Sequence, residues 1–155
     1  PVQLRVAEAF TLLPVFSASP IAGLTLGCVL VNALGAFTAT NILGPLDILF
    51  GSAATLLAAF LTYHFRNVRL KGLPLLSALM PVLVNGVVIG LELTFVISGE
   101  FNLPVFLINA GEVALGEAIS CFALGLPMVR ALEKTGVGKK IFSEESPLCQ
   151  KTATL

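Results

Sequence analysis

Four long apolar segments dominate this sequence and constrain its fold more than any other feature. They cover residues 20–37, 46–65, 74–97 and 103–132. Because an α-helix rises about 1.5 Å per residue, about 20 apolar residues cross a hydrocarbon core of about 30 Å. The first segment is marginally short, and the last is long enough to tilt or to emerge into water. The sequence therefore predicts an all-α membrane protein.

The composition supports this prediction. Hydrophobic residues make up 56% of the 155 residues and charged residues only 12%, whereas soluble domains carry roughly 25% charged residues. So few charges cannot cover a water-facing surface. The formal net charge is zero, so bulk charge gives no indication of nucleic-acid binding. The three cysteines have no paired spacing, and we expect neither a disulfide nor a metal site.

A shorter apolar segment at residues 4–16 precedes the four spans. It is too short to cross a bilayer and contains Pro14, which we expect to end a short helix there, followed by a turn at residues 17–20. After residue 132 the chain becomes polar. We therefore expect one compact domain of about five helices at residues 1–142, followed by a polar C-terminal tail at residues 143–155.

Basic residues gather at two places, the linker at residues 66–71 and the end of the last span at residues 130–140. Lys and Arg mark cytoplasmic loops, so both places, and the C-terminus, are predicted to be cytoplasmic at a cell membrane. The linkers at residues 38–45 and 98–102 lack Lys and Arg and are predicted to face outward. Tracing the spans back places Pro1 outside, which predicts one missing upstream helix and six helices in the intact protein.

Ionisable residues inside the spans are the candidate functional residues, because each costs about 2.5–3.5 kcal/mol to insert. Most ionisable and amide groups fall in the outer half of the spans, as an outward-opening pocket would require. The candidate substrate-binding residues are Arg5, Glu8, Asn32, Asn85, Glu92, Asn109 and Glu112.

Spacing along the helices groups these residues. Asn85 and Glu92 are seven apart, and Asn109 and Glu112 are three apart, so each pair shares one helix face. Glu117 is predicted to point about 140° away from Glu112 and to serve packing.

Structural roles remain open for several of these groups. Arg5 can simply pair with Glu8, and Asp47 can be a first-turn acid favoured by the helix dipole. Asn32 and Asn85 can be hydrogen-bonding groups between helices. Glu92 and Glu112 are the hardest to explain by packing, because a buried carboxylate needs a partner.

The chemistry of these groups favours binding over catalysis. Carboxylates and amides suit a polar ligand with several N–H donors, such as a guanidine-like edge. Phe95, Phe101 or Phe106 could stack on its ring. His64 is the only histidine, and residues 136–140 lack the first glycine and the Ser or Thr of a phosphate-binding loop. We expect no enzyme activity, no cofactor and no catalytic residue.

Several short motifs resemble those of the QueT family of queuosine-precursor transporters over roughly residues 2–133. They are residues 4–9 (LRVAEA), 47–56 (DILFGSAATL), 84–86 (VNG) with 90–92 (GLE), and 116–118 (GEA) followed by 125–127 (GLP). The resemblance implies the substrate-binding S component of an energy-coupling factor (ECF) transporter. It implies six helices and a 7-deazaguanine substrate. The implied partners are a transmembrane coupling protein and two cytoplasmic ATPases.

Two alternatives to a binding subunit stay open from the residues alone. A stand-alone proton-coupled carrier of small molecules would also need buried carboxylates. A structural membrane protein without a ligand would use the same polar groups between its helices.

Overall fold

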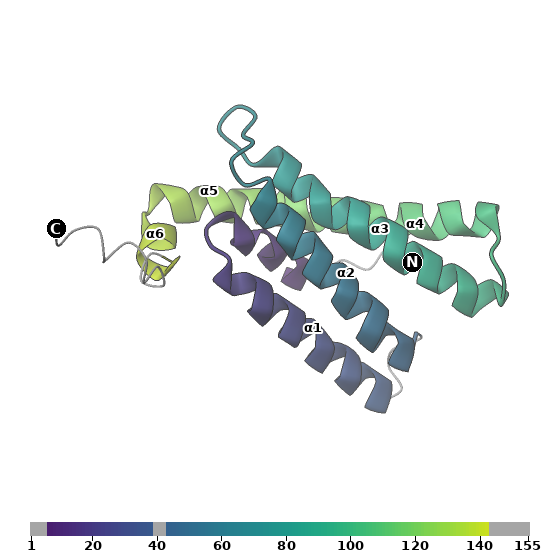
Figure 1. The fold of residues 1–155 in the computed structure, drawn as a ribbon. Helices are drawn as coiled ribbons and strands as arrows, with labels where there is room; N and C mark the ends of the chain where they lie inside the picture. Colours follow the sequence, from purple (N-terminus) through teal and green to yellow (C-terminus); the bar gives the residue numbers. More distant parts are fainter. Residues whose placement is uncertain (1–5, 39–42, 143–155) are drawn as a thin grey trace.

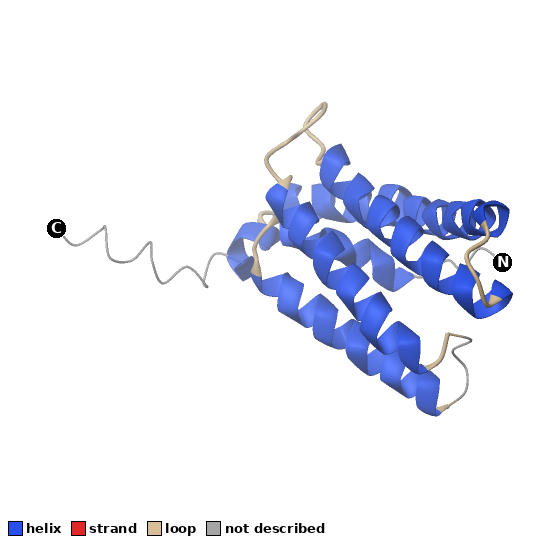
Figure 2. Cartoon of the chain, turned by 45° about the vertical axis from the view of Figure 1, so that its right-hand side comes forward, coloured by secondary structure: helices blue, strands red, loops and turns tan. Residues whose placement is uncertain are grey.

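The computed structural model describes residues 6–38 and 43–142, and these residues form a bundle of helices (Figures 1 and 2). Arg5 and the predicted tail at residues 143–155 lie outside the described residues. The helical elements are η1 (Val6–Val15), α1 (Ser19–Phe37), α2 (Pro45–His64), α3 (Leu75–Ser98), α4 (Leu103–Ala118), η2 (Ile119–Gly125), α5 (Leu126–Lys134) and α6 (Val137–Phe142).

Four helices are long and apolar enough to cross a membrane. They are Ser19–Phe37, Pro45–His64, Leu75–Ser98 and the continuous run Leu103–Lys134, in which η2 is a π-helical segment between α4 and α5. Their bounds lie within two residues of the predicted spans. The all-α fold class is confirmed, and the chain is a multi-pass membrane protein.

Successive spans pack side by side and antiparallel, in the order α1, α2, α3 and α4 (Figure 1). The first element, η1, packs against η2, α2 and α1. Leu12 and Val15 of η1 are buried with Ala78, Cys121 and Val129 in an apolar core. The short N-terminal helix is thus part of the core of the bundle.

The predicted end of this short helix at Pro14 is wrong by one residue. The element is a 3₁₀ helix that contains Pro14 and ends at Val15. Proline lacks a backbone N–H, but close to a helix end this removes little of the hydrogen-bonding pattern. A separate short helix, α6, was not predicted. Phe142 in α6 stacks on Phe16 with ring centroids 5.7 Å apart, so α6 packs against the end of η1.

Small residues set how closely the spans approach. A Cβ atom on Gly90 would lie 2.8 Å from the Cα and Cβ of Ala110, and one on Gly86 would lie 3.2 Å from the Cβ of Ala114. The glycines of α3 therefore allow close contact with α4. Gly23 and Gly27 of α1 have the same four-residue spacing, but added Cβ atoms there would meet nothing within 4 Å among the described residues.

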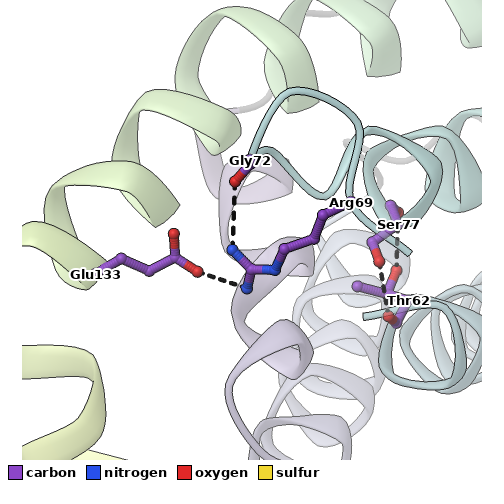
Figure 3. A network of polar contacts seen from close by, with 5 residues as sticks. All are labelled: Thr62, Arg69, Gly72, Ser77 and Glu133. Carbon is purple, nitrogen blue, oxygen red and sulfur yellow. Dashed lines mark hydrogen bonds and ion pairs between the residues drawn. The ribbon is translucent and has the colours of Figure 1, made fainter. Parts of the chain in front are cut away.

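Polar contacts join the spans near the linker between α2 and α3 (Figure 3). Thr62 Oγ1 donates to the Ser77 carbonyl at 3.2 Å, and Ser77 Oγ donates to the Thr62 carbonyl at 3.0 Å. Both side chains are fully buried. Nearby, Arg69 forms an ion pair with Glu133 at 2.6 Å. These contacts fix the register of α2 against α3 and hold their linker near α5.

The reciprocal Thr62 and Ser77 bonds can be tested by a double-mutant cycle with Thr62→Val and Ser77→Ala. Each substitution removes one interhelical bond of about 0.6 kcal/mol and leaves the carbonyl acceptor of the other bond in place. We therefore expect additive losses in the free energy of unfolding, about 1 kcal/mol for the double variant. Unfolding in denaturing detergent, followed by circular dichroism, measures it. Thr135→Val is the control, because this exposed hydroxyl bonds only within its own helix. Unchanged stability of the double variant would contradict the predicted contribution of these bonds.

Candidate functional site

A cavity of about 620 Å³ lies between the helices. Helices α1, α2, α3 and α4 all contribute to its walls, together with one residue of η1. It reaches the end of the bundle where α1 and α3 end. Its polar lining residues are Glu8, Cys28, Asn32, Thr38, Asp47, Thr55, Asn85, Asn109, Glu112 and Glu117.

Most of the predicted binding residues meet at this cavity. Glu8, Asn32, Asn85, Asn109 and Glu112 line it, although they come from four separate elements.

Two predicted binding residues are not among the lining residues. Glu92 is buried but does not line the cavity. Arg5 lies outside the described residues. Asn85 and Glu92 were predicted to share one helix face, and of these two residues only Asn85 lines the cavity.

Glu117 lines the cavity, in contrast to the packing role predicted for it. The packing role was inferred from the angle between Glu117 and Glu112 around the helix. However, Asn109, Val113 and Glu117 follow one another at four-residue intervals and therefore share a helix face. That shared spacing was the signal that could have found Glu117. Glu112 stands at the exposed edge of the same wall, whereas Glu117 is buried.

A hydrogen-bond network closes one end of the cavity. Asn85 Nδ2 donates to Glu117 Oε1 at 2.6 Å, and both residues are buried. Cys121 Sγ lies 3.9 Å from Glu117 Oε2 and 3.7 Å from Thr11 Oγ1. It also contacts the carbonyl oxygen of Glu8 at 3.9 Å. Glu117 is therefore held by α3 on one side and by the η1–η2 contact on the other.

Asn32 and Asn109 make contacts elsewhere along the cavity. Asn32 Nδ2 donates to the Asp47 carbonyl at 2.8 Å and to Cys28 Sγ at 3.4 Å. Asn109 Nδ2 donates to Thr94 Oγ1 at 3.3 Å. Like Asn85, these two asparagines use their amide nitrogen on protein acceptors. The interhelical bonding role considered for Asn32 and Asn85 is present, and both residues also line the cavity.

Among the described residues, the charged side chains that line the cavity are all acidic. Four carboxyl groups line it, from Glu8, Asp47, Glu112 and Glu117. Among its lining residues that the structure describes, there is no Lys, Arg or His. Oxygen acceptors thus outnumber donors, so the cavity suits a ligand that brings N–H donors or positive charge.

Three phenylalanines predicted as possible stacking partners form a separate cluster. Phe101 lies 6.5 Å from Phe95 and 6.1 Å from Phe106 between ring centroids. None of the three lines the cavity, so the prediction that they stack on a ligand there is not supported. They gather where α3 ends and α4 begins.

The described residues hold no group of three or more His, Cys, Asp or Glu side chains that could bind a metal ion. The lining carboxylates are therefore spread along the cavity and are not gathered at one point. This spread suits an extended polar ligand better than a single ion.

A sequence model described as the QueT transporter matches residues 1–134. Searches of curated proteins and of solved structures found no match. The matched residues include every element that lines the cavity, and residues 135–155, which include α6, lie beyond the match. The resemblance noted from short motifs is thereby confirmed over most of the chain. This chain belongs to the QueT transporter family.

Proposed function

We propose that this protein is the substrate-binding membrane subunit of a micronutrient uptake transporter and binds a queuosine precursor of the 7-deazaguanine type from the outside. The observation that carries the proposal is the cavity of about 620 Å³ lined by four carboxyl groups and three asparagines. A deazaguanine edge presents adjacent N–H donors, which a carboxylate can accept in parallel.

The cavity has the size and lining that a small planar ligand needs. Small-molecule sites are typically about 300–1,000 Å³, with apolar walls and a few polar groups that fix orientation. Here Ile89, Leu93 and Val113 supply apolar walls between the polar residues. Glu112 and Asn109 stand on one wall, and the Asn85–Glu117 pair closes the deep end. Glu8 reaches the site from η1.

The direction of binding follows from the placement of basic residues. The cavity extends to the end of the bundle that carries the linker after Thr38, away from the basic linker at Arg69. Lys and Arg favour the cytoplasmic side, so this end faces outward and the C-terminus lies in the cytoplasm. An ECF coupling protein and two ATPases would then contact the opposite, cytoplasmic side.

Replacing Glu112 by Gln is expected to weaken binding of 7-aminomethyl-7-deazaguanine more than tenfold. A hydrogen bond to a charged group contributes about 1.5 kcal/mol or more, which corresponds to that factor. Isothermal titration calorimetry on the purified full-length protein measures the change. Glu100→Gln removes the same charge from an exposed linker residue outside the cavity lining, and it should leave the affinity unchanged. Equal affinity of Glu112→Gln and the parent would refute the role of Glu112.

Two further measurements test the class of function. Mass spectrometry of a small molecule that co-purifies with the protein would identify the substrate directly. Uptake into liposomes driven by a pH gradient, with no ATPase present, would instead support the proton-coupled carrier. Absence of any bound small molecule and of any binding would support a structural role.

A further inference from the structure

Glu92 is a buried acid of α3. Its side chain is 7% exposed, and neither carboxylate oxygen has a partner among the described residues. Burying a carboxylate in this way is costly unless another charge compensates it. A positive charge brought close to Glu92 would therefore offset this cost.

Asp47 of α2 lies at the same level of the bundle as Glu92 of α3. Thr62 and Ser77 bond to each other across α2 and α3. Asp47 precedes Thr62 by the same number of residues by which Glu92 follows Ser77, so antiparallel packing brings the two acids to one level.

Asp47 connects this acidic pair to the cavity. It is 4% exposed and lines the cavity, whereas Glu92 does not. A Cβ atom on Gly51 would collide with Asp47 Oδ1 and would lie 2.8 Å from Asn32 Nδ2. The Asp47 side chain therefore folds back over Gly51 toward Asn32, another lining residue. A ligand in the cavity would meet Asp47, with Glu92 behind it.

We infer that Asp47 and Glu92 form a subsite for a primary ammonium group of the ligand. Asp47 contacts the ammonium, and Glu92 adds a second carboxyl group beside Asp47, whose ionised form the ammonium stabilises. An ammonium group has three N–H donors and one positive charge, so it offsets the repulsion between two buried acids. This inference rests on the proposed function and deepens it, because it selects ligands with an aminomethyl group over neutral ones.

Two ligands that share the same ring system test the subsite. 7-Aminomethyl-7-deazaguanine carries the ammonium, and 7-cyano-7-deazaguanine carries a neutral nitrile in its place. We expect the parent protein to bind the aminomethyl compound about tenfold more tightly or better, as for a charge-assisted bond. Asp47→Asn and Glu92→Gln should each lower affinity for the aminomethyl compound about tenfold. Affinity for the cyano compound should change less than about twofold.

The cyano compound also reports on folding, since a misfolded variant would lose both ligands. Glu100→Gln is the control for a charge lost elsewhere on the same side of the bundle, and it should preserve the selectivity. Equal losses for both ligands, or an unchanged affinity for the aminomethyl compound, would overturn the ammonium subsite while the proposed function stands. If the parent protein binds neither compound, the proposed function and the subsite both fail.

Discussion

Replacing Gly90 by Val is expected to lower the thermal unfolding midpoint by roughly 5–10 °C. A Cβ atom at this position would lie 2.8 Å from Ala110 Cα and 3.0 Å from Ala110 N, both backbone atoms. Backbone cannot move aside as a flexible side chain can, so α3 and α4 must separate. Overpacking of this kind costs about 1–3 kcal/mol, and 1 kcal/mol shifts the midpoint by about 2–4 °C. Circular dichroism of the purified protein in detergent measures the shift.

Gly27→Val is the matched control, because it places the same side chain on a helical glycine of α1. An added Cβ there meets nothing within 4 Å of the described chain, so we expect a shift of less than about 2 °C. Similar midpoints for the two variants would show that the close approach of α3 to α4 contributes little to stability. In that case, the contacts of Gly86 and Gly90 with α4 would not make these glycines more important for stability than Gly23 and Gly27.

The long spans could be predicted because length and hydropathy alone determine them. Pro45 at the start of α2, and Gly99 with a positive φ of 71° after α3, mark helix ends that the sequence makes visible. Asn102 accepts a hydrogen bond from the backbone N–H of Val105 and thereby caps α4. These local signals place the ends of each span within two residues.

The shorter elements could not be predicted in the same way. The π-helical segment η2 depends on contact with η1, where Leu12 occupies the space beside Gly125. The position of α6 depends on the stacking of Phe16 and Phe142. Both features arise from residues far apart in the sequence, and helical periodicity carries no information about such contacts.

The candidate site was predicted in its residue types and only partly in its geometry. Insertion cost alone identified Glu8, Asn85 and Glu112 as candidates, and all three line the cavity. It could not separate Glu92, which lies behind the wall, from Asp47, which lines it. That distinction depends on how α2, α3 and α1 pack against each other, not on the position of a residue along its own helix.

Replacing Glu117 by Ala is expected to weaken binding of 7-aminomethyl-7-deazaguanine about 100-fold. The change removes a buried carboxylate from the cavity and leaves Asn85 Nδ2 without its acceptor at 2.6 Å. A carboxylate can accept two parallel N–H bonds from the ligand, each worth about 1.5 kcal/mol, and the loss of both corresponds to that factor. Glu117→Gln keeps the shape and an acceptor oxygen for Asn85, so its loss should be closer to tenfold. Isothermal titration calorimetry measures both variants.

Asn85→Ala separates the positioning of Glu117 from its direct contact with a ligand. If Asn85 acts by holding Glu117, the double variant should bind no more weakly than Glu117→Ala alone, because the two residues act as one unit. Glu133→Ala serves as the control, since this acid pairs with Arg69 far from the cavity lining and should leave the affinity unchanged. Parent-like binding by Glu117→Ala would contradict a ligand site at this end of the cavity. Strictly additive losses would instead mean that Asn85 and Glu117 contact the ligand independently.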